Sequence, residues 1–538
     1  MGSIRSDSAR AFHQPLGDAI TAISSDNSLR PVPLGPVAWI GFLAMCLGMF
    51  MSVLDIQIVA SSLPDIQTAF GIPLDLLGWV QTAYLIAEII AIPLTARLTR
   101  LLSLRGLFVV AISGFTLASL GAALSPNFDL LLLFRVIQGF CGGAIIPAVF
   151  TAGFALFPPD RRVLPTTIAG IFAMVAPTLG PVVGGYITDT YSWHWMFLIN
   201  LPPGLLVAVL TGALLRGVRP DWPFLRQLDY AGAALAALFL GSFVLFLKEA
   251  PKHHWTGGYI SMLAFVCVAS GIGAVHRCLT HAEPIVELAL FRQRAFAASC
   301  LFSFTLGAGL YGSVYLTPVF LGLVRDHTPI EIGLVMIVSG AAQLLAAPVA
   351  AVAEKRMNLL LLAGIGYGLF GIGLVANAFE TVDTDFAGFF WPQVLRGAGV
   401  MLCILPSMTI ALEHRLGDDL ANASAIFNLM RNLGGTIAIA LVDTVLQQRT
   451  PIHVAGLIAR LQAGDPDAAR IVGLPLDRFH NVPLGPIDEA TKEQVAPMVQ
   501  HAALALTINE AWLLLALLFG LTLLALPLLA GRRKPIRR

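Results

Sequence analysis

The feature that most constrains this chain is a succession of long apolar runs with little polar sequence between them. Apolar residues make up 57% of its 538 residues and charged residues only 12%, compared with about 25% charged residues in soluble domains. A membrane-spanning helix needs about 20 mainly apolar residues. The sequence therefore predicts an all-α polytopic membrane protein, and it excludes a soluble globule, a disordered chain and a single-span receptor.

Fourteen apolar runs are candidate membrane-spanning helices. They cover residues 37–60, 76–97, 104–124, 130–157, 163–188, 195–215, 228–248, 257–276, 296–322, 330–353, 358–379, 388–412, 423–447 and 502–530. The even number puts both termini on one side of the membrane. Because most Lys and Arg residues lie in the odd-numbered loops and the two tails, we expect both termini to be cytoplasmic.

Charge and cysteine usage exclude several classes of function. The net charge of +1 gives no field that would attract nucleic acid. The six cysteines lie within or beside apolar runs, without a C-x-x-C motif or a histidine cluster, so neither a metal site nor a disulfide is predicted. We also find no nucleophile with its base and no phosphate-binding glycine loop, so an enzyme is not expected.

Seven ionisable residues lie inside the apolar runs, where a charge is costly and usually functional. Asp55 and Arg135 lie at matching depths, so they can form a pair. We expect Asp55, Arg135, Glu88 and Arg431 to line a polar cavity. Arg396 is left without a role, and the remaining two, Asp443 and Glu510, are expected to reach water at the membrane interface.

Glycine and proline residues form a motif in the run 163–188. Gly180-Pro181-x-x-Gly184-Gly185 puts two glycines on one helix face, where small residues let helices approach closely. This motif predicts a tight helix contact.

Several motifs together resemble the fourteen-helix drug:proton antiporters of the major facilitator superfamily (EmrB/QacA type), most closely its EmrB-like inner-membrane multidrug exporters. They are Leu54-Asp55-Ile56-Gln57 in the first run, Phe134-Arg135-Val136-Ile137-Gln138-Gly139 in the fourth, Gly180-Pro181-x-x-Gly184-Gly185, Ser192 to Gly204, and Arg431-Asn432-Leu433-Gly434-Gly435. The resemblance covers residues from about 37 to 530.

The resemblance implies the major facilitator fold, with two six-helix halves and two inserted helices. The expected parts are a cytoplasmic tail 1–36, a first half 37–215, inserted helices with linkers 216–295, a second half 296–530 that includes an outside loop 448–500, and a basic tail 531–538.

By the same resemblance, we expect a proton-coupled multidrug efflux antiporter that exports lipophilic and amphiphilic compounds by alternating access. An exporter of a metabolite made by the cell is the alternative. Burial favours the protonated form of a carboxyl and a nearby cation favours the ionised form, so we expect Asp55 as principal proton site, Glu88 as second carboxylate, Arg135 as tuning partner and Arg431 as the charge of the second half. Candidate substrate-binding residues are Gln57, Trp79, Tyr84, Gln138, Tyr311, Tyr315, Phe427 and Asn428.

No cofactor beyond the proton gradient is expected. The resemblance implies two partners, an EmrA-like periplasmic adaptor and a TolC-type outer-membrane channel, and hence the bacterial inner membrane as location. The segment 448–500 is the candidate docking element, with a mobile connector as the alternative.

Four positions depart from the family pattern. His194 stands where an arginine is expected, and Glu88 stands where an uncharged polar residue is expected. Arg100 stands where the superfamily expects an acidic residue between the second and third helices, so the cytoplasmic latch between the halves is in doubt. Arg396 stands where a glutamine is expected.

Overall fold

The computed structural model describes residues 35–60, 63–72, 76, 79–215, 220–413, 415–476, 479 and 489–529. These ranges contain helices and no strand. Twelve of the described helices are long and apolar enough to cross a membrane. The prediction of an all-α, multi-pass membrane protein is thereby confirmed, while most of the two expected tails lies outside the described residues.

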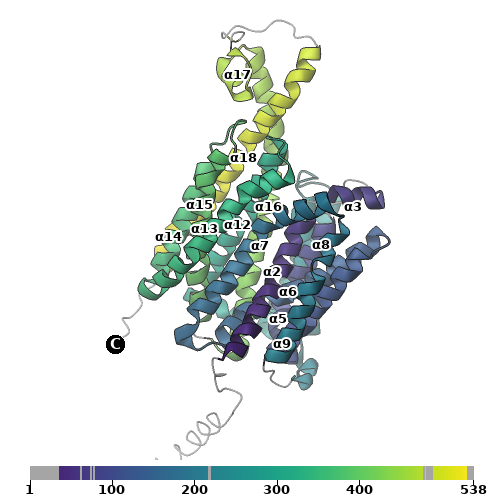
Figure 1. Ribbon diagram of the computed structural model, residues 1–538, viewed down its shortest axis with the longest axis vertical. Coiled ribbons are helices and arrows are strands. Elements are labelled where there is room, and N and C mark those ends of the chain that lie inside the picture. Colours follow the sequence, from purple (N-terminus) through teal and green to yellow (C-terminus); the bar gives the residue numbers. More distant parts are fainter. Residues whose placement is uncertain are drawn as a thin grey trace, which may run out of the picture.

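The helices form two bundles side by side, as Figure 1 shows. The first bundle contains α2 (Pro36–Ala60), α3 (Leu63–Phe70), α5 (Trp79–Ala123), α6 (Phe128–Ala155), α7 (Val163–Thr190), α8 (His194–Leu198) and α9 (Leu201–Leu214). The second contains α12 (Arg294–Leu323), α13 (Pro329–Arg356), α14 (Leu359–Asn377), α15 (Phe386–Leu412), α16 (Gly417–Gln462), α17 (Pro466–Val472) and α18 (Glu489–Leu529). Between them in the chain come α10 (Tyr230–Glu249) and α11 (Gly258–Thr280).

One helix, α5, contains two of the predicted runs. Its 45 residues would measure about 68 Å as one straight helix, twice the ~30 Å thickness of a hydrocarbon core. The backbone at Ser103 is not helical, with φ 66° and ψ 160°. A reversal of the chain at Ser103 would resolve the excess length.

Close approaches to α6 demonstrate this reversal. A Cβ atom added to Gly139 would meet Tyr84 and one added to Gly143 would meet Glu88, whereas one on Gly114 meets Cys141 and one on Gly121 meets Phe134. The first part of α5 thus runs parallel to α6, because the residue numbers of the two rise together along the contact. The second part of α5 runs antiparallel to α6. With α5 as two antiparallel segments, and with α7, the helices are compatible with the predicted fourteen.

Of the inserted pair, α10 lies against the seam between the bundles, and α11 packs on α10. A small apolar cluster joins α10 to α5 of the first bundle and α16 of the second; its buried members are Ile89, Ile92, Leu240, Val244 and Leu429. The inserted helix α10 therefore contacts both halves rather than only linking them in sequence.

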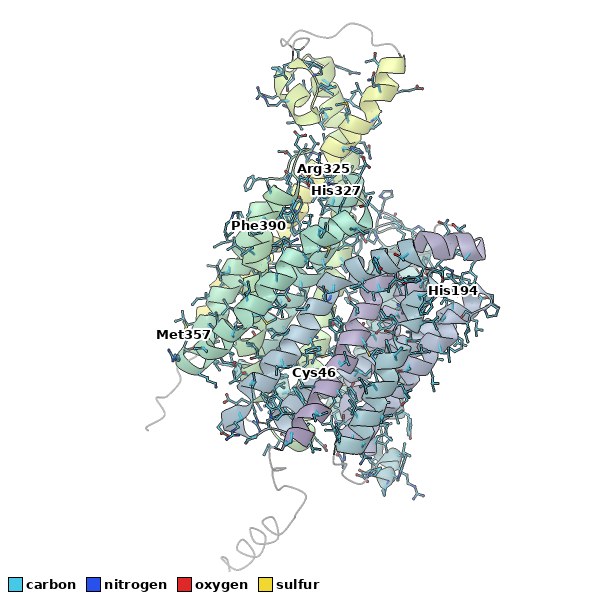
Figure 2. All side chains as sticks on the ribbon, in the orientation of Figure 1. Cys46, His194, Arg325, His327, Met357 and Phe390 are labelled. Carbon is cyan, nitrogen blue, oxygen red and sulfur yellow. The ribbon has the colours of Figure 1, made fainter. Side chains whose placement is uncertain are left out.

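A helical cap protrudes from one end of the molecule (Figure 1). We define the cap as α17 with the adjoining ends of α16 and α18, which share a separate core that includes Leu457, Val472 and Val499. Most described residues of the segment 448–500 are therefore helical. Arg325 and His327 lie near the base of the cap, whereas Met357 lies at the opposite end, called the far end below (Figure 2).

Candidate functional site

A cluster of buried polar side chains lies inside the first bundle. Asp55 of α2 contacts the guanidinium group of Arg135 of α6, and both side chains are 0% exposed. Asn200 donates a hydrogen bond to Oδ1 of Asp55 over 2.7 Å. Gln138 reaches the same oxygen at 3.4 Å and donates to Ser119 over 2.7 Å. The pair that sequence depth allows is thus formed, with an amide on each side.

The Arg135 side chain is held from several directions. Its Nε donates to the carbonyl of Val80 over 3.0 Å, and its guanidinium carbon lies 4.5 Å from the centre of the Tyr84 ring. Its Nη2 has no hydrogen-bond partner among the described residues. Removing one member of a buried ion pair is strongly destabilising, so the arrangement of this cluster depends on both Asp55 and Arg135.

A cavity of about 570 Å³ lies between the two bundles, beside this cluster. Its volume lies within the ~300–1,000 Å³ typical of sites for drug-sized ligands. The polar lining consists of Gln57, Gln81, Glu88, Asn432 and Thr436, together with the tyrosine hydroxyls. The other lining residues are Ile56, Leu85, Ile89, Tyr311, Val314, Tyr315, Pro318, Val319, Gly322, Leu323, Ile332, Gly435 and Ile439. The wall is mainly apolar and aromatic.

Two incompletely paired charges lie near this cavity, one from each bundle. Glu88 of α5 is 2% exposed, and its Oε1 has no hydrogen-bond partner in the described chain. Arg431 of α16 donates through Nη2 to Asn428 over 2.8 Å, while Nε and Nη1 have no partner among the residues described. The two groups interact electrostatically, so they provide an attraction across the seam.

Three of the predicted substrate-binding residues line the cavity, namely Gln57, Tyr311 and Tyr315. The Tyr315 hydroxyl donates to Asp443 over 2.6 Å, which orients the ring at the wall. Asp443 therefore has a partner inside the protein.

Five other predicted substrate-binding residues do not line this cavity, because their side chains make other contacts. Tyr84 donates to the carbonyl of Ser52 over 3.0 Å, and Gln138 belongs to the Asp55 cluster. Asn428 accepts a hydrogen bond from Arg431, and Phe427 is 1% exposed. The Trp79 ring lies 5.7 Å from Lys248 Nζ. Their placement has one physical cause: an aromatic or amide side chain in a span can face any of several neighbours, and the rotation of the helix decides which. A role of these five residues in substrate binding stays a prediction.

Sequence reasoning missed Asn200 and Ser119 in the Asp55 cluster, and Gln81, Asn432 and Thr436 in the cavity wall. Each is a small polar side chain within or beside an apolar run. Such residues are weak signals alone, although the position of Asp55 deep in an apolar run could have prompted a search for partners besides Arg135.

The glycine motif of α7 makes the predicted close contact at Gly180. A Cβ atom there would lie only 2.2 Å from Cβ of Gln57 in α2 and 3.2 Å from its Cα. Real Cβ atoms do not approach so closely, so only glycine fits. Gly184 and Gly185 are also buried, whereas the side chain of Pro181 lies outside what the structure describes.

Ion pairs close the seam at the far end. Arg97 contacts Glu283 at 2.8 Å, and Arg100 lies 3.2 Å from Glu283 and 3.6 Å from Asp418 at the start of α16. Arg100 therefore bridges the bundles with the opposite charge from the one the family pattern expects there, and the acidic partners come from Glu283 and Asp418. The sequence put a latch between the halves in doubt. The structure has such a contact, with a basic residue at position 100 and acidic residues as its partners.

Direct packing reinforces this closure. Ala96 of α5 packs against Ala421 and Ala425 of α16, and Ser424 donates to the carbonyl of Pro147 over 3.0 Å. The cavity, by contrast, extends to Leu323, which is 57% exposed at the last residue of α12 near the cap end. The protein is thus closed at the far end and hollowed toward the cap end.

No group of three or more His, Cys, Asp or Glu side chains in the described ranges is arranged to hold a metal ion. The cluster and the cavity instead combine buried carboxylates, charge pairs and a mainly apolar wall.

Comparisons with known proteins agree with this geometry. The family model described as Major Facilitator Superfamily matches residues 45–439. The chain is 39% identical to the colistin resistance protein EmrB of Acinetobacter baumannii, over 78% of this chain and 82% of the relative. It is 30% identical to the multidrug export protein EmrB of Escherichia coli K12, over 89% and 92% of the two chains.

Among solved structures, the proton:xylose symporter XylE matches with a TM-score of 0.55 at 14% identity, covering 90% of this chain and 95% of that one. This likeness supports the fold alone. The fold, the matched family model and the curated relatives confirm the resemblance inferred from the motifs. The chain belongs to the major facilitator superfamily of membrane transporters, in its EmrB-like group.

Proposed function

We propose that this chain is a proton-coupled antiporter that exports lipophilic and amphiphilic compounds across a bacterial inner membrane by alternating access. One observation carries the proposal: the buried Asp55–Arg135 pair and the large cavity share helix α2. Ile56 and Gln57 line the cavity and directly follow Asp55 in the chain. A substrate that presses on this wall acts on the turn of helix that holds the titratable carboxylate.

The proposed coupling follows from the physics of a buried ion pair. A proton that reaches Asp55 removes the negative charge and leaves Arg135 without its counter-ion in a dry site, which is unfavourable. The strain is relieved when α2 shifts relative to α6, and Gln57 moves with it. Because Gln57 also touches α7 at Gly180, the shift reaches the helix that carries the Gly180-Pro181-x-x-Gly184-Gly185 motif.

The proposed substrate class follows from the cavity wall. Its mainly apolar and aromatic surface suits lipophilic molecules, and the single carboxylate Glu88 favours amphiphiles that carry a positive charge or a hydrogen-bond donor. The names of the EmrB relatives, one for multidrug export and one for colistin resistance, are compatible with this class. This preference requires that Glu88 is not fully paired with Arg431, because a fully paired carboxylate could not bind a substrate.

The test uses the purified protein in proteoliposomes that contain a pH-sensitive dye. A gradient of a lipophilic cationic dye should drive protons in the opposite direction, and a protonophore should abolish concentrative uptake. Co-directional movement of substrate and protons, or flux that a protonophore leaves unchanged, would contradict antiport. Activity confined to one compound made by the cell would favour the metabolite exporter instead.

We further propose that both termini face the cytoplasm, that the cap faces the periplasm, and that the cap contacts an EmrA-like adaptor which leads to a TolC-type channel. The separate core of the cap supports this proposal, because a surface that must present a docking shape needs to be stabilised independently of the membrane spans. The orientation follows from the distribution of Lys and Arg in the loops.

A further inference from the structure

The second bundle contains a buried cation without a hydrogen-bond partner. Arg396 of α15 is 2% exposed, and none of its three guanidinium nitrogens has a partner among the described residues. Its guanidinium carbon stacks 4.7 Å from the centre of the Trp512 ring. A fully buried charge requires compensation by an opposite charge or strong hydrogen bonds, and the stacked indole provides only part of it.

Arg396 lines a small cavity of about 20 Å³ that also has polar walls. Besides Arg396, the polar side chains of its lining are those of Ser313, Thr317, Ser339, Gln343 and Gln393. The Ser313 hydroxyl donates to the carbonyl of Leu310 over 3.0 Å. The hydroxyl of Thr317 and the amide oxygen of Gln343 are without partners in the described chain. By this measure a volume of roughly 10–15 Å³ holds one water molecule, so the cavity has room for one particle of that size or slightly larger.

The nearest carboxylate does not occupy this cavity. Glu380, in the loop between α14 and α15, accepts hydrogen bonds from Asn377 over 2.5 Å and from Nε1 of Trp512 over 3.3 Å. Trp512 therefore touches both groups, with Glu380 at its ring nitrogen and Arg396 on its face. Glu380 acts on Arg396 electrostatically but no ion pair within 4 Å joins them.

We propose that the cavity beside Arg396 is a binding site for one small monovalent anion, of the size of chloride. The guanidinium supplies the charge and several donors, and the hydroxyls of Thr317 and Ser339 supply further donors. Rotation of the Gln343 amide exchanges its unpaired oxygen for an N–H donor, since the two ends are nearly alike in shape. A water molecule could satisfy single donors but would leave the buried charge without a counter-ion.

The anion would lie next to the transport cavity, because Val314 of α12 lines both spaces. An anion beside Arg396 would therefore neutralise the charge of Arg396 where the second bundle borders the cavity. This role is independent of the proposed coupling at Asp55, so the two proposals stand or fall on different experiments.

Anion binding should depend on pH through Glu380. Burial raises the pKa of Glu380 to about 8, against the opposing effects of Asn377, Arg396 and Trp512. Below that pH the carboxyl is neutral and leaves the field of Arg396 to the anion; above it the carboxylate repels the anion. Affinity should therefore fall as pH rises through about 8.

Other charged groups around Glu380 are already paired with one another. Arg325 and His327 lie 3.4 and 3.6 Å from Asp385 at the base of the cap (Figure 2). On α18, Glu510 pairs with Arg449 and His453, and Asp383 in the same loop is exposed. Arg396 is the charged group that acts on Glu380.

The test measures chloride binding to the full-length protein in lipid nanodiscs, with gluconate as the replacement anion. We expect saturable binding of radiolabelled chloride by the wild type, and a rise of about 1–3 °C in its melting midpoint, as ligand binding to the folded state requires. Arg396→Gln should abolish both effects. The matched control Arg356→Gln, at an exposed end of α13, should keep both.

Two further variants keep the proposal falsifiable if Arg396→Gln does not fold. Thr317→Val, which removes one hydroxyl and keeps the shape, should weaken chloride binding several-fold. Glu380→Gln should bind chloride with equal affinity at pH 7 and pH 9, whereas the wild type binds more weakly at pH 9. No binding by the wild type, or unchanged binding by a folded Arg396→Gln protein, shows that the cavity holds water only and overturns the proposal.

Discussion

At the level of single residues, the two carboxylates of the first bundle have different surroundings. Asp55 is fully buried and held by Arg135 and Asn200, whereas Glu88 lines the cavity with one oxygen unpaired. A carboxylate with a fixed counter-ion suits proton exchange that moves a helix. A carboxylate with a free acceptor suits contact with substrate.

The first prediction concerns Asp55→Asn. The amide keeps the shape of the carboxyl but cannot exchange a proton, so we expect uphill substrate transport in proteoliposomes to be abolished. Downhill exchange of substrate should persist, because the cavity is unchanged. Asp383→Asn, on an exposed loop, is the control and should transport like the wild type; uphill transport by Asp55→Asn at a comparable rate would remove Asp55 from the proton path.

At the level of secondary-structure elements, the tightest contact between α7 and α2 is the crossing at Gly180 and Gln57. The approach at Gly180 leaves no room for a side chain beside Gln57. Because α2 carries both Asp55 and part of the cavity wall, we expect bulk at this crossing to displace the proposed proton site relative to the cavity.

The second prediction concerns Gly180→Leu. Forcing bulk into a packed contact costs typically about 1–3 kcal/mol and displaces the backbone, so we expect the variant to reach the membrane but to lose coupled transport. Gly368→Leu in α14 is the control, because a Cβ atom there meets nothing within 4 Å. Comparing drug efflux at equal membrane abundance measures the effect, and equal efflux by both variants would mean that this crossing does not matter for transport.

At the scale of the whole molecule, the far end is closed by charges that come from three parts of the chain. Glu283 follows α11, Arg97 and Arg100 belong to α5, and Asp418 begins α16. These groups lie at the end where the seam must open if the cavity is to face the other side of the membrane. Their attraction therefore favours the closed state observed.

The third prediction concerns Glu283→Gln. Each partly exposed pair is worth about 0.2–1 kcal/mol, so loss of two pairs should increase opening of the far end by about 2- to 30-fold. The measurement is thiol labelling of a cysteine introduced at Ala425, which is 2% exposed in the closed seam. Labelling should rise in Glu283→Gln and stay unchanged in Glu249→Gln, whose surface pair with Lys252 lies outside the seam; no rise would show that the ion pairs do not hold this end closed.

The fourth prediction concerns the cap. Because the cap has a core of its own, replacing residues 455–490 by a flexible linker should leave transport in proteoliposomes largely intact. The same variant should lose co-purification with the adaptor and drug resistance in cells with two membranes. Survival of both properties would show that the adaptor binds elsewhere or not at all.

The sequence alone predicts the fold of this protein to a large extent, because hydropathy and buried charge are properties of short segments. The apolar runs locate the helices, the depths of Asp55 and Arg135 allow their pairing, and the small residues around Gly180 predict a close crossing. None of these inferences requires knowledge of which distant segment lies opposite.

Tertiary structure decides everything that depends on helix rotation and on contacts between distant segments. Tyr84 and Tyr311 are both aromatic residues in spans, yet only Tyr311 faces the cavity, because the Tyr84 ring lies beneath Arg135. Asn200 completes the Asp55 cluster from 145 residues away, and Arg100 finds acidic partners that no local pattern predicts. Hydropathy records how strongly a residue avoids water, but it does not record which residue lies next to it in the fold. That neighbour decides which hydrogen bonds and charge pairs the side chain forms.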